Sequence, residues 1–218
     1  MFIHNPNIKE QSIVVDDTQA LRMYSDGNSK YPSITSVLGQ TADDSWLVTW
    51  RNNVGATEAD RVSRTSSTNG TMLHSLCEDY LNNKTIDFKG IMPIPQSNFK
   101  KMKSWLDDNI DEVYAQEIAL MCHLLKVAGR ADLIAIVNGK LSVVDFKTSK
   151  RPKQRLEISS YFTQCSFYAI AFQETFGIPI KNIVIPIAVE GKPIQVFEGS
   201  VNDSIGELKA RVDKFYTV

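Results

Sequence analysis

The pattern of hydrophobic and polar positions along the chain predicts a succession of helices and strands. Some segments place apolar residues at helical spacing, and others place them at alternate positions or in short runs typical of strands. The predicted helices run from just after an N-cap at Ser33 to about Leu38, over Asp44–Arg64 with Gly55 as a potential break, and over Thr71–Leu81, Ser97–Val113, Leu156–Phe176 and Asp203–Phe215. The predicted strands are an N-terminal hairpin over Ser12–Tyr24, then Ala115–Leu125, Asp132–Val137, Leu141–Thr148, Asn182–Val189 and Ile194–Gly199.

This order of elements predicts an α/β fold in which helices wrap a central mixed β-sheet. With 218 residues, 43% of them hydrophobic, the chain can bury one substantial core. We therefore expect a single domain, with residues 1–70 as an N-terminal hairpin and helical extension and residues 71–218 as the core. The polar stretch Thr65–Gly70 and the segment Pro93–Gln96 are the best loop candidates.

Asn138-Gly139 lies between two strand-like runs and predicts a tight hairpin, because a type I′ turn needs positive φ at both central residues. If these two residues form the turn, Val137 faces Lys140 and Asp132 faces Asp145. Opposed carboxylates about 5 Å apart repel by about 3 kcal/mol at an effective dielectric of about 20. A divalent cation such as Mg²⁺, shared between them, would offset that repulsion.

Lys147 lies two residues beyond Asp145 and so returns to the same face of the strand. The pattern therefore predicts two carboxylates and an ammonium side by side. The alternative is a surface hairpin in which Lys147 simply neutralises Asp145.

Asp132 followed by Asp145-Phe146-Lys147 resembles the Asp…(Asp/Glu)-x-Lys signature of the PD-(D/E)XK nuclease superfamily. Further motifs in the same order resemble its RecB-like branch: Gly70-Thr71-Met72-Leu73-His74, then Glu78, then Gln164-Cys165-Ser166-Phe167-Tyr168. The segment Tyr31 to Leu38 is similar to the opening motif of phage and mitochondrial genome maintenance exonucleases. The resemblance covers residues 31 to 170 and implies a restriction-endonuclease-like fold with an N-terminal helical extension.

The resemblance also implies roles for individual residues. His74, Asp132, Asp145 and the Phe146 carbonyl would bind Mg²⁺ or Mn²⁺, and Lys147 would orient a water or stabilise the transition state. Gln164 would join Asp132, Asp145 and Lys147 in catalysis. Glu78, Glu117 and Tyr168 would lie around these residues and orient them without binding the metal directly.

Each role has a structural alternative. A lone helical histidine such as His74 is more often a core or surface residue than a ligand, and Glu78 or Glu117 could be an ordinary surface carboxylate. Gln164, Tyr168 and Tyr161 share one stripe of the long helix. That stripe faces either the substrate or the core.

A net charge of −1 does not indicate nucleic-acid binding, so the placement of the basic residues matters more than their total. Clusters that flank the expected site are the candidate DNA contacts, with a solvated charged face as the alternative. Hydroxyls at a helix N-terminus could also bind a phosphate. The candidate DNA-binding residues are Ser33, Thr35, Arg51, Arg61, Arg64, Lys150, Arg151 and Tyr161.

Cys77, Cys122 and Cys165 are too few and too widely spaced for a zinc site, a disulfide framework or the four-cysteine iron–sulfur cluster of some RecB-like nucleases. No signal peptide or membrane span is predicted, which favours a cytoplasmic location, in the host cytoplasm if the chain is phage-encoded. The expected function is a metal-dependent exonuclease acting on single-stranded DNA ends, with replication or recombination proteins as potential partners. The rivals are an endonuclease, a lambda-type double-strand exonuclease, and a catalytically silent DNA-binding protein.

Overall fold

The computed structural model of the chain describes residues 1–18 and 20–217. Its main sheet has the strand order β4-β5-β6-β8-β7, and β9 pairs with β8. The strands are β4 (Ile110–Cys122), β5 (Val127–Val137), β6 (Lys140–Val144), β7 (Lys147–Ser149), β8 (Asn182–Val189) and β9 (Gln195–Ser200). Antiparallel pairs join β4, β5 and β6, whereas β6 and β7 both run parallel to β8. The predicted mixed sheet is therefore confirmed.

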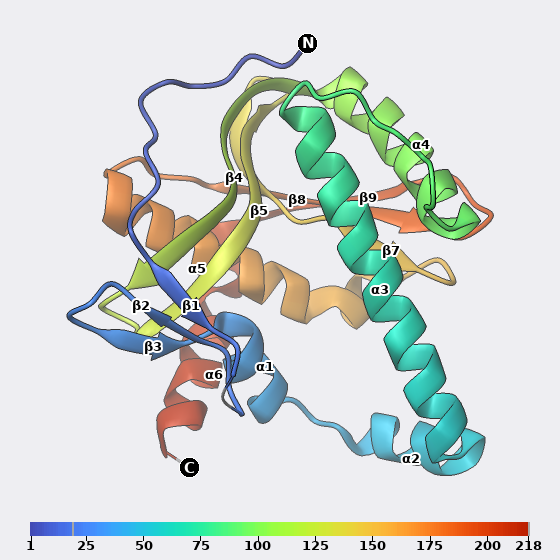
Figure 1. Cartoon of the computed structure of the whole chain (residues 1–218). Helices are drawn as coiled ribbons and strands as arrows, with labels where there is room; N and C mark the ends of the chain where they lie inside the picture. The colour runs from blue at the N-terminus through green and yellow to red at the C-terminus, as the bar shows by residue number, and fades with distance from the viewer. Residues whose placement is uncertain (19, 218) are drawn as a thin grey trace.

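Helices cover both faces of this sheet (Figure 1). One hydrophobic cluster packs α1 (Ile34–Thr41), α5 (Ser159–Phe176) and α6 (Ile205–Thr217) on one side. A second cluster packs the C-terminal half of α3 (Ala56–Leu81) and α4 (Pro93–Asn109) on the other. None of the helices within the described residues is long and apolar enough to cross a membrane.

The N-terminal hairpin predicted over Ser12–Tyr24 belongs to a small three-stranded sheet. Its strands are β1 (Val14–Asp16), β2 (Met23–Ser25) and β3 (Lys30–Pro32), all antiparallel. Gln19, inside the predicted hairpin, and Val218, at the end of the predicted domain, lie outside the described residues. Ser33 follows β3 directly and caps α1, as predicted, because its Oγ accepts a hydrogen bond from the Ser36 N–H at 3.0 Å.

The chain between α1 and the second core forms a helical hairpin that projects from the body (Figure 1). It consists of α2 (Ser45–Val54), a turn at Gly55 with φ of 83°, and the N-terminal half of α3. No residue of α2 is buried, and Trp46 is 68% exposed. The expected break at Gly55 is confirmed.

The predicted loop Thr65–Gly70, and with it the helix end at Arg64, is wrong. One continuous helix, α3, runs from Ala56 to Leu81. Thr65 donates its hydroxyl hydrogen to the Arg61 carbonyl at 2.9 Å, which satisfies the side chain within the helix. The polar run therefore marks a largely exposed stretch of helix, and not an interruption.

The predicted loop Pro93–Gln96 is also wrong, because Pro93 begins α4. Proline is favoured in the first turn of a helix, where its missing N–H would have no partner. The expected helix end at Val113 lies too late, since α4 ends at Asn109 and the β-branched Ile110 begins β4.

The strand predicted over Leu141–Thr148 is divided into β6 and β7, with Asp145 and Phe146 between them. The Asp145 N–H donates to the Val184 carbonyl at 3.2 Å, but the Phe146 N–H turns to the Asp132 carboxylate at 2.8 Å. The sheet ladder is thus interrupted where the candidate site lies.

The remaining predicted boundaries need smaller corrections. The strand predicted from Asp132 begins at Val127, and the strand predicted over Ala115–Leu125 is Ile110–Cys122. The long and final helices are each preceded by a short 3-10 helix, Arg155–Ile158 and Val201–Ser204. The strand over Asn182–Val189 and the helix end at Gly177 are confirmed.

Candidate metal and catalytic site

A cleft of about 610 Å³ opens between the small N-terminal sheet, α1, the middle of α3, the β4–β5 ladder and α5. Nine of the predicted site residues line it: Ser33, Thr35, His74, Glu78, Glu117, Asp132, Lys147, Gln164 and Tyr168. Segments far apart in sequence therefore bring these side chains to one place.

His74, Glu117 and Asp132 form the candidate metal group. Each offers one ligand atom, and these atoms all lie within 4.8 Å of one another. The His74 Nδ1 is 3.4 Å from an Asp132 oxygen, and the His74 Nε2 is 2.8 Å from the Phe146 carbonyl. Since a carbonyl only accepts, Nε2 donates there, so that loss of the Nδ1 proton would leave the Nδ1 lone pair directed at the carboxylate side. Histidine ligands commonly donate their other N–H to a carbonyl in this way.

The predicted register of the β5–β6 hairpin is correct, and Asn138 and Gly139 both have positive φ. Val137 pairs with Lys140 and Leu133 with Val144, so the ladder ends one step before Asp132 and Asp145.

On its other side, Asp132 faces Glu117. The β4–β5 pairs Gln116↔Leu133 and Ile118↔Ala131 flank that position. Glu117 has φ of +47°, a left-handed conformation that costs a non-glycine residue about 1–2 kcal/mol. Strained conformations of this kind cluster at functional sites. Glu117 thus joins Asp132 and His74 in the metal group, and Asp145 as a further ligand stays a prediction.

Asp145 instead pairs with Lys147. The Asp145 carboxylate is completely buried and lies against the Lys147 ammonium, with no further hydrogen-bond partner among the described residues. Burial raises the pKa of Asp145, and Lys147 partly opposes this, so that the pKa is about 6. Burial lowers the pKa of Lys147, but Asp145 and Asp132 outweigh it and the pKa rises above its usual range. Lys147 is thus held as a partly buried cation, 5.0 Å from the centre of the Tyr161 ring.

The metal group carries pKa shifts that reflect crowded charge. Burial and the nearby Asp132 raise the pKa of Glu117 to about 7. Burial lowers the pKa of His74, but Asp132 more than compensates and the pKa rises to about 9. Burial raises the pKa of Asp132, but His74, Lys147 and the hydrogen bond from the Phe146 N–H together bring it below its usual range. Bound protons therefore compete with a cation for this site.

On α5, Gln164 and Tyr168 are joined by a hydrogen bond from the Gln164 Nε2 to the Tyr168 hydroxyl at 2.9 Å. Both side chains line the cleft, although Tyr168 is almost fully buried. The neighbouring apolar stripe, including Phe162 and Phe172, packs in the core. Tyr168 belongs to the same core cluster, so the cleft face and the core face of the helix meet at this residue.

The structure does not bring the predicted cationic contacts into this cleft. Arg51 and Arg61 lie on the projecting hairpin, paired with Asp60 and Glu58 at 2.7 Å, and Arg64 is exposed on the same helix. Lys150 and Arg151 follow β7 and are exposed.

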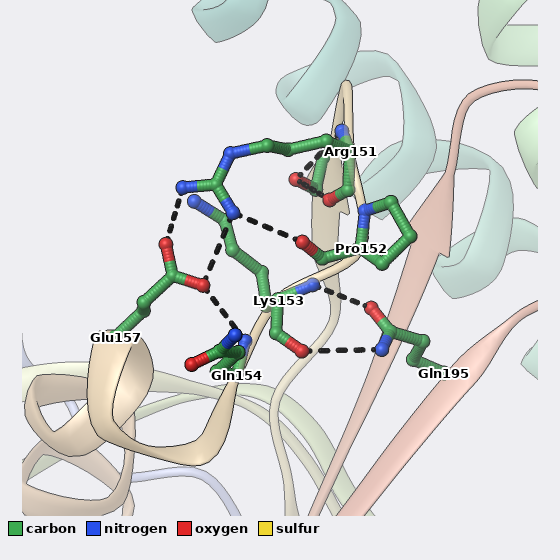
Figure 2. Close-up of polar contacts among 7 residues, drawn as sticks. Arg151, Pro152, Lys153, Gln154, Glu157 and Gln195 are labelled. Carbon is green, nitrogen blue, oxygen red and sulfur yellow. Dashed lines mark hydrogen bonds and ion pairs between the residues drawn. The ribbon is translucent and has the colours of Figure 1, made fainter.

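Figure 2 shows the Arg151 guanidinium paired with Glu157 and donating to the Pro152 carbonyl at 3.1 Å. The same figure shows Gln195 hydrogen-bonded to both the backbone N–H and the carbonyl of Lys153. These contacts brace the segment between β7 and α5. The Arg151 side chain is thus engaged within the chain itself.

Several cleft residues were not predicted. Arg22 and Tyr24 come from the N-terminal sheet, and Arg130 comes from β5. Arg130 could have been found, because it lies two positions before Asp132 and so shares its side of the strand. No local pattern indicates Arg22 or Tyr24, which reach the cleft only through the packing of the small sheet.

Residues 99–198 match the family model of the PD-(D/E)XK nuclease superfamily. The matched stretch includes Glu117, Asp132, Asp145, Lys147 and Gln164, whereas His74 lies before it. No curated protein matches the chain. The central mixed sheet flanked by helices agrees with the restriction-endonuclease-like fold expected from this superfamily, and the match indicates metal-dependent nuclease chemistry.

Proposed function

We propose that this chain is a divalent-metal-dependent DNA exonuclease that hydrolyses phosphodiester bonds from single-stranded ends, in replication, recombination, repair or nucleotide recycling. The observation that carries the proposal is the grouping of His74, Glu117 and Asp132 beside Lys147 and its buried partner Asp145. The superfamily match over residues 99–198 supports it.

The donor set fits a hard divalent cation. Two carboxylates and one imidazole make a mixed oxygen and nitrogen site suited to Mg²⁺ or Mn²⁺. Glu117 and Asp132 face each other with no cation between them except the His74 ring, so a bound ion would relieve their repulsion. When bound, the ion would polarise the scissile phosphate and lower the pKa of a water.

Lys147 supplies a fixed positive charge next to that group. Its ammonium remains protonated because Asp145 and Asp132 hold its pKa high. A cation held in position before the reaction stabilises negative charge that develops in the transition state. Asp145 keeps Lys147 in place, and the Phe146 carbonyl keeps the His74 ring in place.

The size of the cleft favours a single strand. Its volume of about 610 Å³ is in the range of sites for small ligands, about 300–1,000 Å³. We propose that a short stretch of single-stranded DNA enters this space. Gln164, Tyr168, Ser33 and Thr35 line it and are proposed to contact the strand.

The test is an assay with end-labelled linear and circular single-stranded DNA in Mg²⁺ or Mn²⁺. The linear strand is expected to be degraded and the circle to survive. Lys147→Ala and Asp132→Asn are expected to lose activity by about 10²-fold or more. Lys209→Ala, which removes an exposed cation on α6, is the matched control and should retain full activity.

Each alternative outcome has a clear meaning. If neither substrate is lost with metal, the chain is a silent DNA-binding protein and the nuclease proposal fails. Cutting of circles would instead identify an endonuclease. A strong preference for duplex ends would identify a lambda-type activity and overturn the single-strand proposal.

A further inference from the structure

The cleft holds a second polar group that the proposed chemistry does not use: Arg22, Tyr24 and Arg130. Tyr24 is buried, and burial raises the pKa of its hydroxyl while Arg22 and Arg130 lower it. Both guanidinium groups are therefore within electrostatic reach of one hydroxyl. The three residues come from different parts of the chain, β5 and the small N-terminal sheet.

The two arginines differ in how far their charge is neutralised. The Arg22 Nε donates to Asp17 at 2.5 Å. Arg130 is exposed and makes no ion pair with another described residue. Arg130 also acts on Glu117, whose pKa it lowers in part. If a metal ion neutralised Glu117 and Asp132, these two carboxylates would no longer offset the charge of Arg130.

An arginine is well suited to bind a phosphate, because its planar guanidinium can donate two parallel hydrogen bonds to the anion. Contacts to phosphates fix the register of a bound strand without reading its sequence. Arg130 lies two residues from Asp132 and lines the same cleft. A strand with one phosphate at the metal group would therefore place a neighbouring phosphate within reach of Arg130.

We propose that Arg130 is a positioning residue that binds the phosphate next to the scissile one, with Arg22 and Tyr24 forming the wall behind it. The inference rests on the proposed nuclease function and specifies how that site holds its substrate. The competing explanation is that Arg130 only balances the charge of Glu117.

The test uses single-stranded oligonucleotides in which one phosphate at a time is replaced by a neutral methylphosphonate. With the unaltered protein, one neutral linkage beside the cut is expected to reduce kcat/KM by about 10- to 100-fold. Arg130→Ala is expected to show a loss of that size on the normal strand and no further loss at that linkage. Arg130→Lys should recover part of the activity. The proposal is wrong if the two changes act independently, so that for every neutral linkage the loss in kcat/KM of Arg130→Ala on the altered strand equals the product of the two separate losses.

A binding measurement separates this proposal from the nuclease proposal. Without metal, fluorescence anisotropy of a labelled strand is recorded over a range of salt concentrations. Arg130→Ala should reduce the slope of log K against log salt by about 0.7, the value for one phosphate contact on a single strand, and Lys209→Ala should leave it unchanged. A reduced slope with no cleavage by any variant would sink the nuclease function alone. If Arg130→Ala leaves the slope unchanged, or changes only the Mn²⁺ concentration needed for activity, then Arg130 only balances the charge of Glu117 and the phosphate-binding proposal is wrong.

Discussion

At the scale of single residues, Glu117 shows how a strained backbone and a perturbed pKa meet at one position. Its left-handed conformation directs a carboxylate towards Asp132, in surroundings that penalise its charge. Both effects destabilise the folded state, but they leave a carboxylate that is able to bind a cation. Removal of the Glu117 carboxylate should therefore raise the folding stability and weaken cation binding.

We predict that Glu117→Gln stabilises the metal-free protein at pH 8 but not at pH 5. The folded-state pKa of about 7 lies above the ordinary value of 4.5, so the folded protein binds the extra proton between these values. The Glu117 carboxyl group therefore makes its full contribution to the free energy of unfolding below pH 4.5, and this contribution is lost as pH rises to about 7. Glutamine does not titrate, so the Glu117→Gln variant does not lose stability in this range. Thermal melts in a chelator should show a gain at pH 8, with about 2–4 °C for each kcal/mol. An equal shift at both pH values would contradict the assigned cause.

Gly129 has no room for a side chain. A Cβ there would lie 2.9 Å from Tyr168 Cε1, 3.1 Å from Ile34 Cγ2 and 3.3 Å from Phe167 Cε1. Gly129→Ala is therefore expected to destabilise the fold by about 1–3 kcal/mol. Gly39→Ala, in α1 with open space around it, is the control and should be neutral or stabilise by up to about 1 kcal/mol. Urea unfolding would measure both, and equal effects would refute the packing explanation.

The sequence predicts this site in part. The Asn138-Gly139 turn predicts the β5–β6 register, which places Asp132 beside Asp145 and Phe146. It leaves open whether Asp145 shares a cation with Asp132 or pairs with Lys147, because that choice depends on burial in the folded core. Nor does any short-range pattern pair Glu117 with Asp132, since the β4–β5 alignment includes bulges near Val113.

At the scale of elements, α3 combines two environments in one helix. Its C-terminal half buries Leu73, Cys77 and Leu81, whereas its N-terminal half buries only Ala59. Together with α2, the exposed half forms the projecting hairpin. Helical stability in proteins comes mainly from such burial.

Amide hydrogen exchange should therefore differ along this single helix. We expect rapid exchange over residues 45–66 and strong protection over residues 72–81, measured by mass spectrometry of overlapping peptides. Gly55→Pro is not a suitable probe, because its positive φ excludes proline. Uniform protection from Ala56 to Leu81 would mean that the helix opens only as a unit.

The length of α3 illustrates where prediction by pattern fails. The polar residues from Thr65 to Gly70 have no apolar face, and a stretch without periodicity is typical of a loop. In the structure these residues remain helical, because helical turns of α3 precede and follow them and continue the backbone hydrogen bonding. Conversely, the helix end at Gly177 and the strand Asn182–Val189 are correctly predicted, because a glycine cap and a continuous apolar run are strong local signals.

At the scale of the whole molecule, metal binding should be visible as stability. A ligand that binds only the folded state adds about 2.7 kcal/mol at a concentration 100 times its Kd. With about 2–4 °C for each kcal/mol, Mn²⁺ should raise the melting temperature by about 5–10 °C at pH 8. Asp132→Asn should remove most of this increase, and Lys209→Ala should not. A shift of equal size in all three proteins would place the ion elsewhere.

The continuity of α3 has a further consequence, because the projecting hairpin and His74 share one helical axis. Each residue of an α-helix adds about 1.5 Å of rise and about 100° of rotation. One residue inserted between Ala56 and Gly70 would thus swing α2 by more than a quarter turn about the site, with His74 unmoved. Seven inserted residues would lengthen the arm by about 10 Å and return α2 nearly to its original heading. The number of residues in α3 before His74 therefore determines the direction in which the hairpin points around the axis of this helix.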